Sequence, residues 1–468
     1  MHYEKFHDGT VKCIEDEIPF EIPRGWAWCR LGFPFLTRTG STPPTKDTSL
    51  YGPDYPFFKP ADLNDGLSII NSIDHVSEKG FRTGRMTPSE SVLVTCIGAT
   101  IGKTGIIRRD GICNQQINAI LPNKYMCFEF IYFQMCSSFV QAQIKMNASA
   151  TTLPLLNKTQ FDKLLIILPP ANEQNRIAKT IIDLLRINGI IESKKQCLHN
   201  SLKNTKSKIL DLAIRGKLVP QDLKDEPASV LLERIQAEKE ELIKQGKIKR
   251  DKNDSVIFKG DDNSYYERFR DGRQKCIDNE IPFDIPDNWR WCRLKNLAAP
   301  ESNSFADGPF GSNLKQEHYT DTPEVRIIQL NNIGNLEWKD EIKKYTTYSH
   351  AHTLERCKTI PGDIVIAKMM PAGRAIIVPN VHKIFVISSD NIRLRLSKNL
   401  ETKYVYYMIN SPSVNRLVLD TVQGVGRTRT SLGKLREMIC PIPPITEQER
   451  IVTAIEKYIY NLDIVAKT

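Results

Sequence analysis

The sequence predicts an α+β protein in which two β-rich domains, related by an internal pseudo-twofold repeat, are separated by long coiled-coil helices. Three observations predict it. Segments 3–31 and 266–294 are about two-thirds identical, with no low-complexity bias. A second repeated segment ends each copy: Leu168–Ile177 reads LPPANEQNRI and Ile442–Ile451 reads IPPITEQERI. Between the two copies, the apolar spacing changes from strand-like to helical.

These landmarks divide the chain of 468 residues into four segments. We expect a first β-rich domain over residues 1–170 and a central helical region over 171–250. A second β-rich domain follows over 251–445, and a distal helix occupies 446–468. Between the repeated segments, the sequences of the two copies differ freely. This pattern is expected of a protein that recognises two different targets with one architecture.

Short apolar runs bounded by Gly, Pro or Asn predict the strands of both β-rich domains. In the first domain they are Ser91–Ala99 and Lys163–Pro169, and in the second they are Gly362–Met369 and Ala375–Asn380. The segments between such runs are polar and rich in side chains that form hydrogen bonds, so we expect loops there.

The central region begins with a coiled-coil pattern. We expect one helix of about 45 residues, with Asn172 as its N-cap and Gly216 as its stop. Apolar residues recur at heptad spacing along it. The positions of this seam are Ile177, Ile181, Leu184, Ile191, Leu198, Leu202, Ile209 and Leu212. The polar residues Asn188 and Lys195 interrupt it.

A second, shorter helix is expected next. Asp225 and Pro227 provide its start signals and Gly246 its end. Its apolar stripe consists of Leu231, Ile235 and Leu242. A basic, polar linker follows over residues 247–252, which precedes the second β-rich domain.

The distal helix repeats the seam of the central one over about 22 residues. Thr446 and Glu449 are expected to form a capping box at its start. Its seam positions are Ile451, Ile455, Tyr458 and Leu462. We expect these helices to act as spacers and as docking surfaces.

Composition restricts the classes of function. The formal net charge of +10 favours an acidic partner, of which nucleic acid is the commonest. No apolar run approaches the roughly 18 residues that span a bilayer, and no secretion signal opens the chain. We therefore expect a cytoplasmic protein without a membrane partner.

The cysteines and histidines predict no metal site. The chain has 11 cysteines and no pair at CxxC spacing. Cys13, Cys29, Cys276 and Cys292 recur because the module recurs, and we expect them to be reduced, buried thiols. The pair at His350–His352 has no third ligand nearby in the sequence and is expected to lie in a polar loop.

Several segments resemble catalytic motifs without matching them. Gly98–Thr104 (GATIGKT) has three residues between its first glycine and the Gly-Lys pair, whereas a P-loop needs four. The DGPFGS segment at 307–312 lacks the strand and acidic residue of a dinucleotide site. We find no Asn-Pro-Pro-aromatic segment of an adenine methyltransferase and no carboxylate-lysine cluster of a nuclease. We therefore expect a chain without catalytic residues.

The polar loops contain the side chains that bind DNA bases and phosphates: Asn, Gln, Ser, Thr, Arg and Lys beside flexible glycines. In the first copy the candidates are Arg38, Ser41, Thr42, Thr45, Lys46, Lys103, Thr104, Asn114, Gln115, Gln116, Asn147, Thr151 and Thr152. In the second copy they are Phe310, Ser312, Asn313, Lys315, Asn331, Asn332, Lys368, Arg374, Asn391, Arg427, Arg429 and Thr430. For Arg427 and Arg429, which lie beside two glycines, we favour DNA contact over a merely soluble loop.

Several motifs carry a family resemblance. Leu210–Gln221 (LDLAIRGKLVPQ), followed by Asp225–Lys249, resembles the central helical region of the specificity subunit of type I restriction-modification systems. The PP-x-x-EQ-x-RI segments at Pro169 and Pro443 are similar to that family, as are DGPFGSNLK at 307–315 and the GDIVIAKM segment. The resemblance covers nearly the whole chain.

This resemblance implies two target-recognition domains, each of which reads one half of an asymmetric, bipartite site on double-stranded DNA. It also implies partners: methyltransferase subunits, expected to be two, and motor-nuclease (restriction) subunits that cleave unmodified DNA. No cofactor is expected on this chain, because S-adenosylmethionine, ATP and magnesium would be bound by those partners. The distal helix is shorter than the counterpart that the family often has.

Two other classes of function are compatible with parts of the sequence. A coiled-coil scaffold that binds only protein would show the same heptads and the same repeat, but would not need diverged β-rich modules with polar loops. An enzyme that acts on nucleic acid by itself would need motifs that we do not find. DNA binding at low salt would separate the first class from a DNA-recognition protein.

Overall fold

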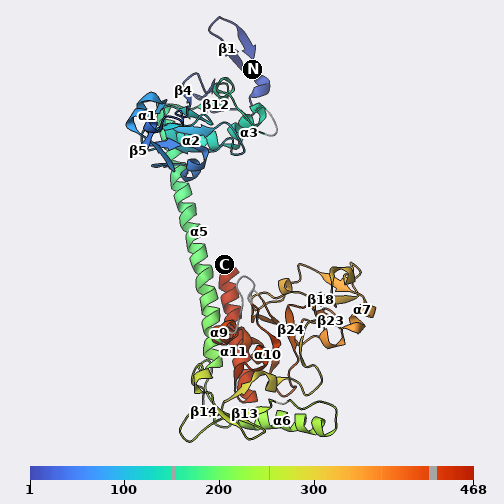
Figure 1. The fold of residues 1–468 in the computed structure, drawn as a ribbon. Coiled ribbons are helices and arrows are strands. Elements are labelled where there is room, and N and C mark those ends of the chain that lie inside the picture. Colours follow the sequence, from blue (N-terminus) through green and yellow to red (C-terminus); the bar gives the residue numbers. More distant parts are fainter. Residues whose placement is uncertain (150–152, 252, 370–371, 421–428, 468) are drawn as a thin grey trace. The chain divides into compact units, whose positions relative to one another are not determined.

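The computed structural model describes residues 1–149, 153–251, 253–369, 372–420 and 429–467. The chain forms two compact units (Figure 1), which we call unit 1 (Met1–Ser193) and unit 2 (Lys194–Thr468). The long helix α5, Ala171–Ile214, begins in unit 1 and ends in unit 2. The predicted boundaries at residues 170, 250 and 445 stay predictions.

Unit 1 is built on two 4-stranded sheets. The first has the order β4 (Thr37–Thr39), β11 (Ile117–Ile120), β8 (Val92–Thr95) and β9 (Thr104–Ile106). The second has the order β6 (Asp74–Val76), β5 (Tyr51–Phe58), β10 (Gly111–Cys113) and β7 (Met86–Thr87), with β5 and β10 parallel. Two strand pairs accompany them: β1 (Tyr3–Lys5) with β2 (Val11–Cys13), and β3 (Ala27–Arg30) with β12 (Leu165–Leu168). The helices are α1 (Glu78–Thr83), α2 (Phe128–Cys136), α3 (Ser138–Asn147) and α4 (Lys158–Asp162).

Unit 2 repeats this plan strand for strand. Its first sheet has the order β17 (Phe305–Asp307), β24 (Asn391–Leu394), β21 (Ile364–Ala367) and β22 (Ala375–Ile377). Its second has the order β19 (Lys344–Thr346), β18 (Val325–Ile328), β23 (Phe385–Ile387) and β20 (Lys358–Thr359), with β18 and β23 parallel. The strand β16 (Arg290–Arg293) pairs with β25 (Ile439–Ile442). The predicted α+β repeat is therefore confirmed in the sheets themselves.

Unit 2 also has elements that precede its copy of the repeat. The helix α6 (Ala228–Lys244) leads to β13 (Ser255–Lys259), which forms a 3-stranded sheet with β14 (Tyr265–Phe269) and β15 (Gln274–Cys276). The remaining helices are α7 (Tyr348–Thr353), α8 (Thr402–Asn410), α9 (Pro412–Asp420), α10 (Leu432–Arg436) and α11 (Ile445–Lys467). In unit 1 the described residues contain no counterpart of α6 and β13.

The strand predictions are confirmed. β8, β12, β21 and β22 lie inside the four apolar runs that predicted them. Some predicted loop residues lie in strands instead: Arg38 is in β4, Thr104 opens β9 and Asn391 opens β24. These polar residues sit where a strand meets a loop, and the sequence pattern does not fix that boundary.

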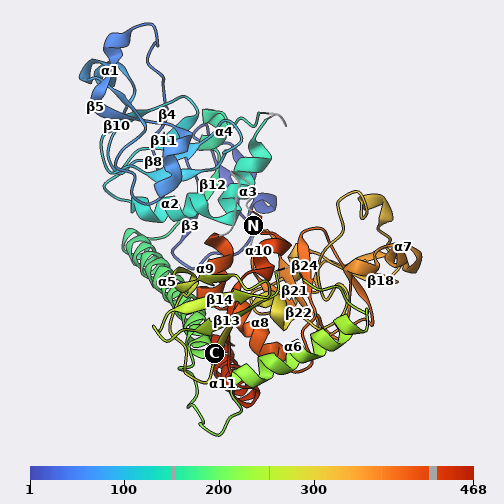
Figure 2. The ribbon, with the colours of Figure 1, turned by 60° about the horizontal axis from the view of Figure 1, so that its bottom comes forward.

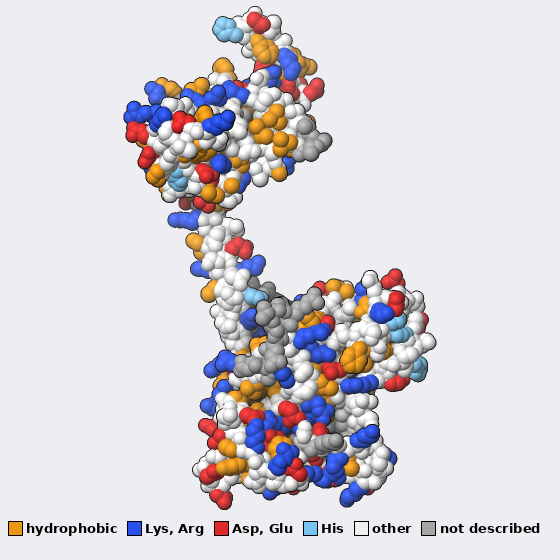
Figure 3. All heavy atoms as spheres, in the orientation of Figure 1, with side chains coloured by type: hydrophobic (Ala, Val, Ile, Leu, Met, Phe, Trp, Pro, Cys, Tyr) orange, Lys and Arg blue, Asp and Glu red, His pale blue; other side chains and the backbone are white. Residues whose placement is uncertain are grey.

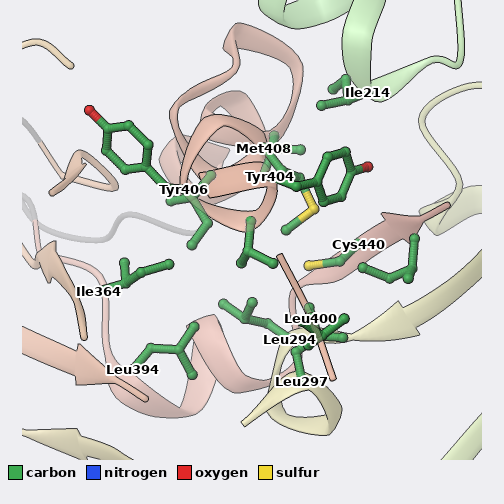
Figure 4. Packing of buried hydrophobic residues seen from close by; sticks show 14 of the residues in the cluster. Ile214, Leu294, Leu297, Ile364, Leu394, Leu400, Tyr404, Tyr406, Met408 and Cys440 are labelled. Atoms are coloured by element: carbon green, nitrogen blue, oxygen red, sulfur yellow. The ribbon is translucent and has the colours of Figure 1, made fainter. Parts of the chain in front are cut away.

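The largest core of unit 2 joins several elements (Figure 4). Ile214 from α5, Tyr404 and Met408 from α8 and Cys440 from β25 converge on one interior, and all four are 2% exposed or less. Burial of a large apolar side chain contributes about 1.5–3 kcal/mol. The last turn of α5 is therefore part of the core of unit 2.

The ends of α5 and α6 follow the glycine rule that predicted them. Gly216 has φ +66°, the Gly216 N–H donates to the Ala213 carbonyl (3.2 Å), and the Lys217 N–H donates to the Leu212 carbonyl (2.9 Å). This is a Schellman motif, which needs a left-handed residue at that point. Gly246 closes α6 in the same way, with φ +71°.

The predicted caps at the helix starts are wrong. α5 begins at Ala171, and the Pro170 carbonyl accepts from the Glu173 N–H, so Asn172 lies inside the first turn. α11 likewise begins at Ile445, so Thr446 is not an N-cap and forms no capping box with Glu449. A proline directly before a helix fixes its own φ and provides the first acceptor, so no polar cap is needed.

Asp225 is not a capping residue either. α6 begins after Pro227, as predicted, but the Asp225 carboxylate accepts from the Thr446 hydroxyl (2.5 Å) and the Arg450 guanidinium (2.6 Å). The side-chain hydrogen bond from Arg450 lowers the pKa of Asp225. The carboxylate thus ties the segment before α6 to the first turns of α11.

The predicted seam is buried only in part. Ile451 and Ile455 of α11 are 0% exposed and Ile209 of α5 is 9% exposed. Figures 1 and 2 show α11 beside the C-terminal part of α5, where the Lys206 ammonium pairs with the Asp463 carboxylate (2.5 Å). Other seam residues are exposed; they are Leu184, Ile191, Leu198 and Tyr458.

The cysteines and histidines depart from two expectations. All 11 cysteines are free thiols and Cys292 is buried as expected, but Cys29 is only partly buried and Cys13 and Cys276 are exposed. Cys13 and Cys276 lie at the ends of β2 and β15, two strands whose residues are all exposed. His350 and His352 lie on the helix α7 rather than in a loop. Within the described residues, no helix combines the length and apolarity needed to cross a bilayer.

Candidate nucleic-acid interface

In unit 1, two predicted loops meet at one end of the sheets. The Gly40 N–H donates to the Ile117 carbonyl (2.9 Å), and the Ser41 N–H donates to the Cys113 carbonyl (2.8 Å). The Thr42 hydroxyl donates to the Gln115 side chain. A Cβ at Gly40 would collide with the carbonyls of residues 113 and 114, so the close approach of the two loops requires glycine there.

Two arginines flank this meeting point. The Arg38 guanidinium donates to the Met86 carbonyl (2.5 Å), and the Arg85 guanidinium donates to the Thr39 carbonyl (2.9 Å). Burial raises the pKa of the Cys113 thiol to about 11, and the positive charges of these two arginines partly oppose that shift. The surface formed by loops 40–46 and 114–116 is therefore edged by cationic side chains.

In unit 2 the equivalent loops meet in the same way. The Gly308 N–H donates to the Asn391 carbonyl (2.9 Å), and a Cβ at Gly308 would collide with the Ser388 carbonyl. Gly40 and Gly308 both follow the edge strand of the first sheet directly, β4 in one case and β17 in the other. The repeat therefore places loops 40–46 and 308–315 at the same position of the architecture that the two units share, which we call the frame. The sequences of the two loops are unrelated.

A cleft of about 510 Å³ opens beside loop 308–315. Its lining includes Phe310, Asn313, Lys368 and Arg429, four residues that the sequence analysis proposed from three separate segments. The Lys368 ammonium pairs with the Asp307 carboxylate (3.0 Å). The Arg429 guanidinium pairs with the Asp390 carboxylate, and this arginine is 54% exposed.

The two ion pairs are joined through the backbone. The Lys368 N–H donates to the Asp390 carbonyl (2.8 Å), and the Thr430 N–H donates to the Lys368 carbonyl (2.9 Å). Lys368 thus connects the turn at 388–391 with the segment that carries Arg429. A guanidinium held by one carboxylate keeps a fixed orientation, and its remaining N–H groups can be offered to a ligand.

Phe310 is the most exposed apolar side chain of this surface, at 77%. It lies between Pro309 and Gly311 at the tip of the loop. Exposed aromatic rings of this kind stack on bases or wedge between base steps in complexes with nucleic acids. The cleft therefore combines cationic, amide and aromatic groups.

Several predicted residues form hydrogen bonds inside the protein. The Lys103 ammonium donates to the Pro60 carbonyl (2.8 Å), and the Asn147 amide donates to the Gln143 carbonyl (2.8 Å). Four further candidates are almost completely buried; they are Thr104, Asn114, Asn332 and Asn391. Thr430 is 3% exposed. These side chains shape the loops.

The other candidates are at the surface or outside the described residues. Thr45, Lys46, Ser312, Lys315 and Asn331 are exposed, while Ser41, Gln116 and Arg374 are partly buried. Thr151, Thr152 and Arg427 fall outside the residues that the structure describes. The assignment of all these residues to DNA contact stays a prediction.

Two candidate residues were missed. Arg85 lies against the loop 40–46 of unit 1, where its N–H donates to the Ser41 hydroxyl (3.3 Å). The exposed Arg356 lines the cleft of unit 2. Both arginines follow short helices, and the only signal in the sequence would have been an arginine near the start of a β run, which is too common to be specific.

The charge on the surface is mixed. On the face shown in Figure 3, Lys and Arg side chains are interspersed with Asp and Glu over both units. Among the residues that line the cleft, Arg356, Lys368 and Arg429 are cationic and Asp307 is the only acidic one. The local charge at the cleft is therefore positive.

Comparisons with known proteins agree with this geometry. The model of the family described as "Type I restriction modification DNA specificity domain" matches residues 23–200 and 309–468. The EcoEI specificity subunit of Escherichia coli, a type I restriction enzyme component, is 30% identical over 271 residues, which are 56% of this chain and 40% of that protein. The EcoAI specificity subunit of Escherichia coli is 30% identical over 267 residues, 54% of this chain and 38% of that protein. The chain thus spans about two-fifths of the length of these curated relatives.

Solved structures share the fold. A chain from a study of complex assembly and conformational transition of the type I R-M system has a TM-score of 0.60 at 16% identity, covering 96% of this chain and 94% of that one. The HsdS subunit from Thermoanaerobacter tengcongensis has a TM-score of 0.51 at 18% identity, with the same coverage. The family model matches well over half of the chain, in both copies of the repeat. The chain belongs to the family of type I restriction-modification DNA specificity domains.

Proposed function

We propose that this chain is the DNA sequence-recognition subunit of a type I restriction-modification complex. Unit 1 and unit 2 each read one half of a bipartite, asymmetric site on double-stranded DNA. One observation carries the proposal: the same two sheets, in the same strand order, present loops of unlike sequence at the same position. Residues 38–46 read RTGSTPPTK, whereas 307–315 read DGPFGSNLK. One frame with two different reading surfaces gives two unrelated half-sites.

The chemistry of the two surfaces supports different readouts. Unit 1 offers neutral hydrogen-bonding groups from Thr42, Gln115 and Gln116, and amides of this kind bind the major-groove edge of adenine. Unit 2 offers Arg429 and Arg356 beside the exposed ring of Phe310. Arginine favours guanine when it binds a base and any sequence when it binds a phosphate.

The catalytic steps belong to partner subunits in this proposal. Methyltransferase subunits, two for the two copies of the frame, would use S-adenosylmethionine, and motor-nuclease subunits would use ATP and magnesium, all in the cytoplasm. The exposed seam residues Leu184, Ile191 and Leu198 support a docking role for α5, because exposed apolar residues gathered along one helix mark contact sites for proteins. The same helix would act as the spacer between the two half-site readers.

Reconstitution tests the proposal. The purified chain, the separately purified methyltransferase and the two together are incubated with DNA and labelled S-adenosylmethionine. We expect sequence-specific methylation only from the mixture. Methyl transfer by the chain alone would contradict the proposal, and so would a mixture whose sequence preference is the same without the chain.

The exposed seam of α5 also favours a second candidate, a scaffold that binds only proteins. Filter binding to random duplex DNA at low salt separates the two, because phosphate contacts make DNA binding strong at low salt and weak at high salt. A scaffold would show no such salt dependence.

A further inference from the structure

Loop 308–315 of unit 2 is held differently at its two ends. At its start, Gly308 is bonded to β24, and the Cys357 thiol contacts the Asp307 carbonyl (3.5 Å). At its end, Leu314 is buried in the core of the second sheet. The backbone on either side of Leu314 is bonded to two histidine side chains, which the proposed function does not use.

These histidines form a stacked pair. The rings of His318 and His350 lie 4.0 Å apart between centroids, with 20° between their planes. The His350 Nε2 atom lies 2.9 Å from the Asn313 carbonyl oxygen, and the Lys315 N–H donates to the Nδ1 atom of His318 (3.0 Å). A carbonyl only accepts and a backbone N–H only donates, so His350 carries its proton on Nε2 and His318 has none on Nδ1.

Each histidine is fixed by its own element. The carbonyl of His318 accepts from the Thr346 hydroxyl of β19 (2.8 Å). The N–H of His350 donates to the Thr347 hydroxyl, which caps α7 (3.1 Å). Figure 3 shows histidine side chains on this side of unit 2, over the region that Figure 1 labels β18 and α7. The pair therefore connects the loop to the strand β19 and to the helix α7.

Unit 1 anchors its equivalent loop with a different side chain. The Tyr51 hydroxyl, at the start of β5, donates to the Pro43 carbonyl (2.7 Å). Tyr51 packs against the cluster of Phe57, Val76, Phe81 and Ile112, so its ring is held in place. In both units, a side chain of the second sheet or of its helix donates to a carbonyl near the middle or end of the loop. The donors come from different elements, β5 in unit 1 and α7 in unit 2, and each binds a carbonyl of the loop.

We propose that His318 and His350 are positioning residues that hold the reading loop 308–315 in register, and that Tyr51 does the same for loop 40–46. This inference rests on the proposed function, because it states what makes each half-site readout stringent. Asn313, whose carbonyl is held by His350, lines the cleft, and so does Phe310, three residues before it. If the anchor is lost, the loop can adjust to a wrong base, so discrimination falls more than affinity does.

The experiment measures discrimination at each half-site separately. The complex of the full chain with its methyltransferase methylates duplexes that carry the intact site or one substituted base in either half. The parent is compared with His350→Ala, His350→Gln and Tyr51→Phe. Glutamine retains an amide N–H close to the position of Nε2, so it serves as the conservative rescue of the hydrogen bond.

We expect His350→Ala to lower the ratio of correct to incorrect methylation about fivefold to tenfold in the second half-site, the scale of one hydrogen bond, and to leave the first half-site ratio unchanged. His350→Gln should restore most of the ratio. Tyr51→Phe should show the opposite pattern, with loss confined to the first half-site. The thermal unfolding midpoint of each variant and its unchanged half-site ratio both report that the chain is folded.

Three results would overturn the proposal while the proposed function stands. The first is a parental ratio at the second half-site in His350→Ala, and the second is an equal loss at both half-sites in either single variant. Failure of His350→Gln to restore discrimination would also overturn it, because bulk rather than the hydrogen bond would then explain the alanine effect. If the parent complex itself shows no bipartite preference, the proposed function fails, and the positioning role fails with it.

Discussion

The frames of unit 1 and unit 2 form the same polar contacts, but the side chains that form them are more deeply buried in unit 2. In unit 1, the Arg30 guanidinium binds Glu4 and Glu17, both at 2.8 Å. In unit 2, Arg293 binds Glu267 and Glu280, at 2.5 and 2.8 Å. The side chains of Arg30 and Glu4 are 19% and 22% exposed, whereas those of Arg293 and Glu267 are 7% and 2% exposed.

The indole contacts repeat this difference. Trp26 donates to Glu173 (3.1 Å) in unit 1, and Trp289 donates to Glu447 (2.9 Å) in unit 2. Trp289 is 1% exposed and Glu447 is 0% exposed. Their counterparts Trp26 and Glu173 are both partly exposed.

The helix α6 and the strand β13, which we call the cover of unit 2, cause this difference in burial. β13 pairs with β14, and its Ser255 hydroxyl donates to Glu267 (2.6 Å). Leu231 and Ile235 of α6 enter the same core as Trp289. Among the described residues of unit 1, β1 pairs with β2 alone. Identical hydrogen bonds therefore contribute differently to stability, because an ion pair in a buried site cannot lose one partner without leaving an uncompensated charge.

Substitution of the two arginines gives the largest expected contrast. Arg293→Ala leaves Glu267 buried without its partner and should destabilise unit 2 by about 3–5 kcal/mol. Arg30→Ala should cost at most about 1 kcal/mol, because water reaches its partners. Chemical denaturation, monitored through hydrogen exchange of the β14 and β1 amides, measures the loss of stability in each variant. Equal losses of stability would show that the cover does not determine how much this ion pair contributes.

The cover can also be weakened directly. Leu231 is 0% exposed, and Leu231→Ala should cost about 3 kcal/mol through lost burial and a cavity. The amides of β14 in unit 2 should then exchange faster, and those of β1 in unit 1 should not change. Leu223→Ala is the matched control, since Leu223 is 99% exposed and should change stability by less than about 0.5 kcal/mol. Faster exchange in both units would mean that the two frames are not stabilised independently.

The reading surfaces should separate in the same way, with a smaller effect. Arg429→Ala should cost about 1–3 kcal/mol of discrimination at one base of the second half-site if the guanidinium binds a base edge. Binding to duplexes altered in each half-site measures this. A uniform loss over all sequences, with a shallower dependence on salt, would assign Arg429 to a phosphate instead.

The smallest effect concerns pH. Burial raises the pKa of Glu447, although the hydrogen bonds from Trp289 and Gln221 oppose the shift. The contribution of this carboxyl is therefore full below its unfolded pKa of about 4.3 and declines as the pH rises through the raised folded value. The stability of Glu447→Gln relative to the parent should thus improve from acid to neutral pH. A difference that is constant across this range would mean that Glu447 ionises without penalty.

The sequence predicted the repeat, the strands and the length of α5, because these depend on local periodicity and on near-identical segments. It failed where the partner of a residue is distant. Asp225 looked like a helix cap but binds Arg450, more than 200 positions away. Cys13 was expected to be buried together with the other cysteines of the repeat, yet it is exposed at the end of β2.

The candidate site shows the same limit. Asn391 and Phe310 were both proposed because they lie in predicted polar loops, but Asn391 is 0% exposed and Phe310 is 77% exposed. Which side of the strand end a side chain occupies depends on the packing of the second sheet. Lys368 and Arg429 could each be proposed from the sequence, but only the folded structure shows that they line the same cleft.

A methylation map tests the central claim most directly. Genomic DNA from cells that carry this chain and its methyltransferase is sequenced for modified adenine, with cells that lack only this chain as the control. The account predicts one motif with two unlike halves separated by a fixed gap, which is lost in the control. A palindromic motif, a continuous motif or a map that does not depend on the chain would contradict two different readers built on one frame.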